Sequence, residues 1–371
     1  MTEAPKLKDY FTGDLVRETG ERVRSVHPSF DVEGFVVAAI GEDWEGLAFT
    51  ARSRRIGDAL WGTLDLDVEP ALDVVTSLLP EELDDPDGAL NNGFWMWPLS
   101  DLIANHAVDH LDAGLDACEA LTKRFTSEFA VRPFLARYPE AMDRVADWAN
   151  DPSEHVRRLA SEGTRPRLPW AARLDLPMEP VLDVLTGLRR DESLYVRRSV
   201  ANHLNDLAKI DSDHIVSLLE EWHGEGIPET TWIVRHAMRN HLKNGDPRVM
   251  ALFGYEPADV VVDGLAITPD RVAIGESVVI TFDLFETAGR DQKLMVDLVV
   301  GYVKSNGSIG PKVFKFKDFE LEARATESCR KNLDMVIRST RQLHPGTHSI
   351  TVRVNGADLA SASFDLSAGG S

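Results

Sequence analysis

Apolar residues recur at helical spacing through the first two thirds of the chain, most clearly within residues 148–173. A start signal at Asp151-Pro152-Ser153 is followed by apolar positions at i, i+3, i+4 and i+7, namely Val156, Leu159, Ala160 and Gly163. This spacing predicts a helix with one apolar stripe. Pro166 and Pro169 forbid its continuation, so we expect the helix to end in a stiff loop.

The face opposite this stripe and the loop after it are rich in arginine, with one indole at the end of the loop. The residues are Arg157, Arg158, Arg165, Arg167 and Trp170. Arginine forms planar, bidentate contacts with phosphate, so this pattern favours binding of a phosphodiester backbone. Glu162 lies among these cations, which would keep its carboxylate ionised and suited to stabilising a developing positive charge. The alternative is a solvated surface pair between Glu162 and Arg158 at i,i+4 spacing.

The segment Asp151–Arg158 recurs about 40 residues later as Asp191–Arg198, a period typical of HEAT-type helix pairs, and Val234–His236 resembles a third copy. The repeated arginines, which would form a line of positive charge along one face of a solenoid, are Arg157, Arg158, Arg197, Arg198 and Arg235. A solenoid presents an extended surface, and a DNA duplex is an extended anionic rod. The alternative is a scaffold in which these arginines pair with acidic residues of neighbouring repeats.

Three carboxylates near this line of arginines are not repeated. Glu162 aligns with Asn202, and Asp206 follows about one turn later in the second repeat. Glu128 lies in the preceding helical segment, which stacking of repeats would place beside the first. We therefore expect Glu128, Glu162 and Asp206 to converge.

The composition changes near residue 255, and the chain is expected to divide into an all-α HEAT-like solenoid (1–255) and an all-β domain (256–371). Short strand-like runs, and the hairpin signal Asn355-Gly356, predict an Ig-like sandwich in the second part. Lys312 and Lys315 flank a Gly-rich turn and could contact phosphate. The alternative for these lysines is a solvated hairpin tip.

The net charge of -21 argues against a nucleic-acid-binding protein at first inspection. The acid is concentrated in blocks, such as residues 81–87, and a local cationic strip can still bind DNA. No apolar run is long enough to span a membrane, and two distant cysteines favour free thiols in the cytoplasm. His106 and His110 are four residues apart without further ligands, so neither a metal nor a cofactor is expected. A monomer is expected.

Two ten-residue motifs resemble those of the AlkC group of bacterial alkylbase DNA glycosylases. They are Ser161–Trp170 (SEGTRPRLPW) and Phe125–Phe134 (FTSEFAVRPF). The runs Arg52–Ile56 and Trp95–Pro98 also fit, and the resemblance covers residues 5 to 255. Some AlkC-like proteins carry an Ig-like domain, as expected here.

This resemblance implies a monofunctional DNA glycosylase that excises 3-methylcytosine and 3-methyladenine from alkylated DNA without full base flipping. It makes Glu162 the first candidate catalytic carboxylate and Glu128 the second, with Asp206 nearby and Trp170 against the deoxyribose. The residues expected to hold phosphates are Arg157, Arg158, Arg165, Arg167, Arg197, Arg198 and Arg235. Two other classes remain open: a HEAT-repeat scaffold without chemistry, which the net charge favours, and a protein that binds DNA lesions without cutting them.

Overall fold

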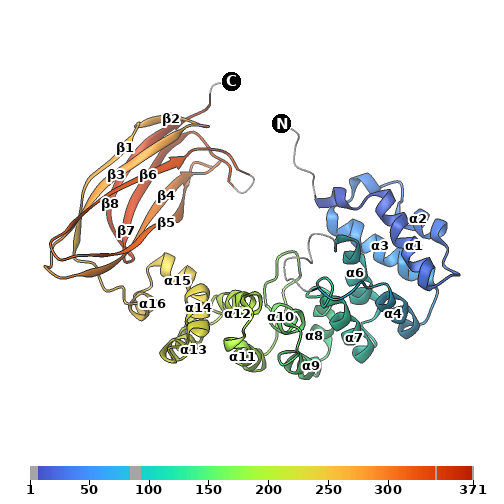
Figure 1. The fold of residues 1–371 in the computed structure, drawn as a ribbon. Coiled ribbons are helices and arrows are strands. Elements are labelled where there is room, and N and C mark those ends of the chain that lie inside the picture. Colours follow the sequence, from blue (N-terminus) through green and yellow to red (C-terminus); the bar gives the residue numbers. More distant parts are fainter. Residues whose placement is uncertain (1–6, 84–92, 339–340, 370–371) are drawn as a thin grey trace. The chain divides into compact units, whose positions relative to one another are not determined.

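The computed structural model describes residues 7–83, 93–338 and 341–369, and it divides into two compact units (Figure 1). The first unit is Met1–Ala237 and the second is Met238–Ser371. The acidic block at 81–87 lies partly outside the described residues. No helix in the described ranges has both the length and the apolar character needed to cross a membrane.

The first unit is helical throughout its described part. Its helices are η1 (Leu7–Tyr10), α1 (Gly13–Val26), α2 (Val32–Ala39), η2 (Trp44–Gly46), α3 (Phe49–Leu64), α4 (Val68–Ser77), η3 (Phe94–Met96), α6 (Trp97–His106), α7 (Leu111–Thr122), α8 (Arg132–Arg137), α9 (Ala141–Trp148), α10 (Glu154–Glu162), α11 (Met178–Gly187), η4 (Leu188–Arg190), α12 (Leu194–Leu207), α13 (Ser212–Gly224) and α14 (Pro228–Ala237).

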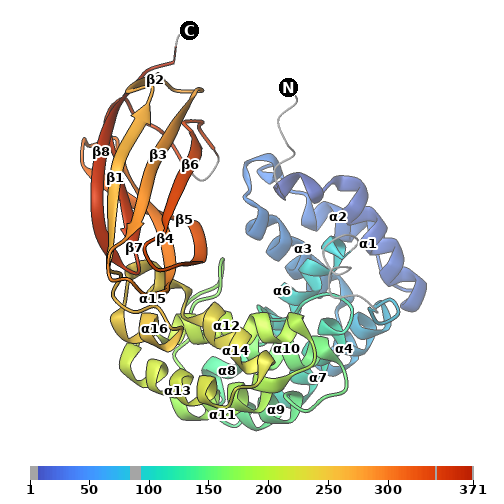
Figure 2. The same ribbon diagram turned by 60° about the vertical axis from the view of Figure 1, so that its left-hand side comes forward.

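The later helices of this unit form two layers, because each helix buries one apolar stripe against its neighbours. Helices α10, α12 and α14 pack on one another in one layer, and α9, α11 and α13 lie in the other (Figures 1 and 2). The predicted stripe of α10 is buried at Val156, Leu159 and Ala160. The all-α HEAT-like fold is therefore confirmed.

The two repeats predicted from the sequence begin in the same way. Ser153 and Ser193 have the same backbone angles, φ -78° and ψ 123°, before α10 and α12. The backbone N–H of each serine donates to the carboxylate of the aspartate two residues earlier, at 2.7 Å to Asp151 and 2.8 Å to Asp191. This shared turn explains why the Asp-x-Ser pattern recurs.

The second unit begins with two short helices, continues as strands and folds into two sheets. Its elements are α15 (Arg239–Asn244), α16 (Pro247–Leu252), β1 (Val260–Thr268), β2 (Arg271–Ala273), β3 (Ser277–Glu286), β4 (Gln292–Val303), β5 (Ile309–Leu321), β6 (Thr326–Asp334), β7 (Gly346–Val354) and β8 (Ala357–Ser367). One sheet has the order β1-β3-β6 and the other β2-β8-β7-β4-β5.

The side chains between the two sheets form a single apolar core that includes Ile280, Phe282, Leu298, Ile350 and Val352. All strand pairs are antiparallel except β2 with β8. The predicted Asn355-Gly356 turn joins β7 to β8, and both residues have positive φ, 45° and 83°. An Asn-Gly pair favours this conformation, so the predicted all-β sandwich is confirmed.

Helices α15 and α16 belong to the second unit, although the change from helix to strand falls later, and Arg353 of β7 donates to the carbonyl of Lys243 in α15 at 3.1 Å. The segment after α16 is held in the same way. The Tyr255 hydroxyl donates to both carboxylate oxygens of Asp318 at 2.9 and 2.8 Å. Lys293 Nζ donates to the carbonyl of Phe253 at 2.9 Å. The change at 255–256 thus marks the end of the helical sequence, and the compact units divide after Ala237.

Candidate active site

The three carboxylates expected to converge are joined by two arginines into one row of alternating charge. Arg158 reaches both oxygens of Glu128 at 3.5 Å and approaches Glu162 Oε1 at 4.0 Å. Arg165 donates to Glu162 Oε1 at 2.6 Å and to Asp206 Oδ2 at 2.6 Å. We call these five residues the charged row. Its members come from the segment before α8, from α10 and the loop after it, and from α12.

Burial and neighbouring charge act in opposite directions on the pKa values of Glu162 and Asp206. Glu162 is only 7% exposed, and burial by itself raises its pKa. Arg158, Arg165 and the Ser199 hydroxyl outweigh burial and bring the pKa of Glu162 below its ordinary value. The pKa of Asp206 is lowered for the same reason, by Lys209 and Arg165 against burial. Both groups are therefore anionic at neutral pH.

Lys209 extends the charged row at its end in α12. Its ammonium group lies 2.9 Å from Asp206 Oδ1. Lys209 was not among the residues that the sequence singled out. Its positive charge is thus paired with the carboxylate of Asp206.

The loop after α10 carries Arg165 and Trp170, and a buried arginine, Arg132, holds it through hydrogen bonds to its backbone. Arg132, at the start of α8, donates to the carbonyls of Gly163, Arg165 and Ala172 at 3.2, 2.8 and 2.6 Å. Burial, together with the nearby cation of Arg165, lowers the pKa of Arg132 to about 10. Arg132 lies within the motif Phe125–Phe134, but no role was predicted for it from the sequence.

Trp170 lies at the tip of this loop with its indole open to solvent. Its side chain is 68% exposed and its φ is 67°, a left-handed conformation that is unusual for tryptophan. Its ring lies 6.3 Å from that of Trp97 and 6.5 Å from that of Phe49. An exposed aromatic in a fixed, sparsely populated conformation is typical of a binding position.

A hollow of about 370 Å³ opens at the loop that carries Trp170, and no member of the charged row lines it. Its walls include the aromatic rings of Trp97, Phe129 and Trp170, and Arg132 and Asp101 also line it. Burial raises the pKa of Asp101. Phe129 directly follows Glu128, so one motif supplies both a carboxylate and an aromatic wall. Phe129 and Asp101 were not predicted as site residues.

The arginines predicted to bind phosphate fall into distinct environments. Arg157 donates to the carbonyls of Asp151 and Pro152 and to Asp191, and Arg197 donates to the carbonyls of Asp191 and Glu192. The first arginine of each repeat thus braces the turn before its own helix. This is a structural reason for its recurrence that the sequence did not reveal.

The remaining predicted cations differ in how far they are open to solvent. Arg158 and Arg165 are occupied by the carboxylates of the charged row, and Arg235 is half-buried in α14. Arg167 and Arg198 are exposed and form no ion pair within the described ranges. These two are the predicted arginines best placed for an external anion.

The two predicted lysines lie on β5 beyond the Gly-rich turn, and both are exposed. Lys315 pairs with Asp318 at 2.9 Å, and the ammonium of Lys312 lies 5.5 Å from the centre of the Phe314 ring.

The His106 and His110 side chains bind other partners. His106 Nε2 lies 2.8 Å from Asp58, and His110 Nδ1 lies 3.8 Å from Glu69. No group of three potential metal ligands occurs among the residues that the structure describes.

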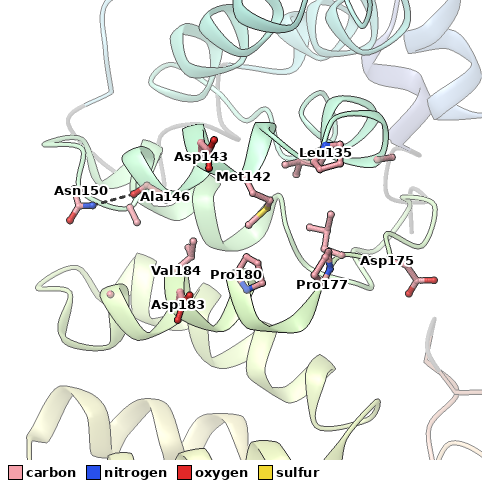
Figure 3. A pocket seen from close by; sticks show the side chains of 15 residues that line it. Leu135, Met142, Asp143, Ala146, Asn150, Asp175, Pro177, Pro180, Asp183 and Val184 are labelled. Atoms are coloured by element: carbon pink, nitrogen blue, oxygen red, sulfur yellow. Dashed lines mark hydrogen bonds between the residues drawn. The ribbon is translucent and has the colours of Figure 1, made fainter.

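A larger groove, of about 630 Å³, lies in the other helix layer, between α9 and α11 (Figure 3). Met142, Pro180 and Val184 line it together with aspartates at its edge. None of the predicted site residues lines this groove, whereas Trp170 lines the smaller hollow.

The fold defines a HEAT-like helical protein, and comparison with known proteins relates it to DNA alkylation repair. A family model described as DNA alkylation repair enzyme matches residues 103–241. The C-terminal Ig-like domain of the uncharacterised protein YhaZ matches residues 261–368.

The chain belongs to the AlkC and YhaZ family. It is 36% identical to the uncharacterized protein YhaZ of Bacillus subtilis (strain 168) over 97% of this chain and 99% of that one. It is also similar to the solved structure of Pseudomonas fluorescens alkylpurine DNA glycosylase AlkC bound to DNA containing an abasic site analog. That match has a TM-score of 0.91 and 37% identity, and covers 98% of this chain and 100% of that chain.

Proposed function

We propose that this protein is a monofunctional DNA glycosylase that releases 3-methylcytosine and 3-methyladenine from DNA. The observation that carries the proposal is the charged row, in which three buried carboxylates are held by two arginines and the pKa values of Glu162 and Asp206 are lowered. Membership of the AlkC and YhaZ family supports the same activity, since the similar AlkC structure holds DNA with an abasic site analog, which resembles the product of base release.

The chemistry suits preorganised carboxylates. A base methylated at N3 is already cationic, so when the bond between C1′ and the base nitrogen breaks, the bond's electron pair neutralises the base. Positive charge then develops on the sugar. Glu162 is assigned to stabilise this oxocarbenium-like sugar, because fixed charges in a nearly dry site act most strongly on developing charge. Glu128 is assigned to orient the attacking water and accept its proton, with Asp206 holding Arg165 in place.

Binding of DNA is assigned to the cations around the charged row. Arg167 and Arg198 are exposed and would contact phosphates flanking the lesion, with Arg235 further along. Arg157 and Arg197 would contribute charge from their braced positions, and Arg158 and Arg165 chiefly hold the carboxylates. Trp170 would pack against the deoxyribose, and Lys312 and Lys315 offer a further phosphate contact. The lesion would be read without full base flipping, as the resemblance to AlkC implies.

The test is base release from a duplex that contains one 3-methylcytosine or one 3-methyladenine. We expect release by the wild type and loss of at least 100-fold in rate for Glu162→Gln, because removal of one preorganised group costs roughly 10²–10³ in rate. Glu128→Gln should be slowed, and Glu119→Gln, a matched change outside the site, should not. Borohydride should trap no protein–DNA adduct.

The alternatives predict different results. Tight binding of the lesion duplex without release would identify a lesion sensor. If the protein neither releases the base nor binds the duplex at low salt, it is a scaffold, and the glycosylase proposal is refuted.

A further inference from the structure

Ser199 occupies a position where the preceding repeat has a core leucine. The repeat alignment that pairs Val156 with Val196 also pairs Leu159 with Ser199. Both are buried, Leu159 at 1% exposure and Ser199 at 3%. A hydroxyl at a core position gives up apolar burial and must find a hydrogen-bond partner. Its partner therefore indicates why serine stands there.

That partner is the carboxylate of Glu162. Ser199 Oγ lies 2.5 Å from Glu162 Oε2 and 2.9 Å from Ser161 Oγ. The other carboxylate oxygen, Oε1, accepts from Arg165 at 2.6 Å. Glu162 is thus held at both oxygens, by the loop after its own helix at Oε1 and by helix α12 of the next repeat at Oε2.

Two separate donors on the two oxygens fix the rotation of the carboxylate group. Without Ser199, Glu162 would face only the guanidinium groups of Arg165 and Arg158, both toward Oε1, and the group could turn about its terminal bond. A charge that must stabilise a transition state acts best when it is already oriented.

We propose that Ser199 is a positioning residue for base release, which holds the Glu162 carboxylate in its working orientation. This inference rests on the proposed function, because it assigns Ser199 a role in that reaction. Ser199 does not contact the substrate and acts through Glu162 alone.

A change at Ser199 also alters the ionisation of Glu162. The charged and titratable groups that face Glu162 are Glu128, Arg132, Arg158, Arg165, Tyr195, His203 and Asp206. All of these groups stay in place in Ser199→Ala. The change removes only the hydroxyl that donates a hydrogen bond to the anionic Glu162 carboxylate. Loss of such a donor raises a carboxyl pKa, so the acid limb of the pH–rate profile should move to higher pH.

The experiment measures single-turnover base release from a 3-methylcytosine duplex between pH 5 and pH 8. The variants are Ser199→Ala and Ser199→Cys, which keeps the shape of the side chain but donates weakly. Ser100→Ala is the matched control, because Ser100 is a buried helical serine whose hydroxyl has no partner within the described ranges. DNA affinity and melting temperature are measured on every variant.

We expect both Ser199 variants to release base about tenfold more slowly at neutral pH, a ratio that corresponds to one hydrogen bond. We also expect the shifted acid limb and unchanged DNA affinity, with the control at the wild-type rate and pH profile. Wild-type rates and profiles in both Ser199 variants would overturn this inference while leaving the glycosylase proposal intact. Absence of release by the wild type would instead overturn the proposed function.

Discussion

Arg132 gives the sharpest prediction, because one buried side chain holds the loop that carries Arg165 and Trp170. The change is Arg132→Met, which keeps most of the side-chain volume and removes every donor. Arg132 is 6% exposed, and its three acceptors are carbonyls of the segment 163–172. No water can easily replace a donor buried to this degree, so the carbonyls would lose their partners.

The expected cost follows from these three hydrogen bonds. A net loss of about 1 kcal/mol for each gives about 3 kcal/mol, and the loss of a buried charge, which is itself costly to desolvate, keeps the estimate at this lower end. For a unit of this size, 1 kcal/mol moves the melting temperature by roughly 2–4 °C, so the helical unit should melt about 6–12 °C lower. Displacement of Arg165 and Trp170 should slow base release by about 100-fold.

Tryptophan fluorescence provides a suitable assay, because all eight tryptophans lie in the helical unit. The matched control is Arg137→Met in the same helix, where the side chain is 53% exposed and pairs with Asp109 at 2.5 Å. A surface pair contributes at most about 1 kcal/mol, so the control should melt within about 4 °C of the wild type. Equal melting temperatures and equal rates of base release for Arg132→Met and Arg137→Met would refute the role of Arg132 in holding this loop.

Three further predictions concern pH, salt and the second unit. Burial lowers the pKa of His203 to about 4, so between pH 6.5 and 4 the unfolded chain binds a proton that the folded chain does not. The urea midpoint should therefore decrease as the pH is lowered from 6.5 to 4. It should decrease further below pH 4, where Glu162, whose pKa is lowered in the folded state, becomes protonated. A constant midpoint from pH 6.5 to 4 would contradict this prediction. Arg198→Ala should reduce the slope of log Kd for DNA against log salt concentration by about 0.9. Arg157→Ala should instead lower the melting temperature, because the Arg157 guanidinium braces a turn. A larger reduction of the salt slope for Arg157→Ala than for Arg198→Ala would reverse the two assignments. Tyr255→Phe removes a hydroxyl that donates to the carboxylate of Asp318 in β5. It should lower the free energy of unfolding of the β-sandwich, followed by circular dichroism, by about 1.5–3 kcal/mol and leave the tryptophan transition unchanged. An unchanged unfolding free energy would show that this hydrogen bond contributes nothing.

Local pattern alone determined the class of fold. The apolar stripe of α10, the Asp-x-Ser turns before α10 and α12, and the Asn355-Gly356 hairpin are properties of short segments. Their physics acts over a few residues, through helical periodicity, capping hydrogen bonds and positive φ, so it can be read directly from the chain. The repeat alignment also isolated Glu162 as a carboxylate without a counterpart.

Only the tertiary structure decided which neighbours each of these residues has. The sequence left two interpretations of the repeated arginines open, a line of positive charge or pairs with acidic residues of neighbouring repeats. In the structure Arg157 braces a turn and pairs with Asp191, Arg158 pairs with Glu128, and Arg198 is exposed. Arg158 and Arg198 occupy equivalent positions in two repeats but differ, because the partner of Arg158 is Glu128, 30 positions away in the preceding segment. The roles of Arg132 and Ser199 are invisible in the sequence for the same reason, since each is defined by atoms of a different repeat or loop.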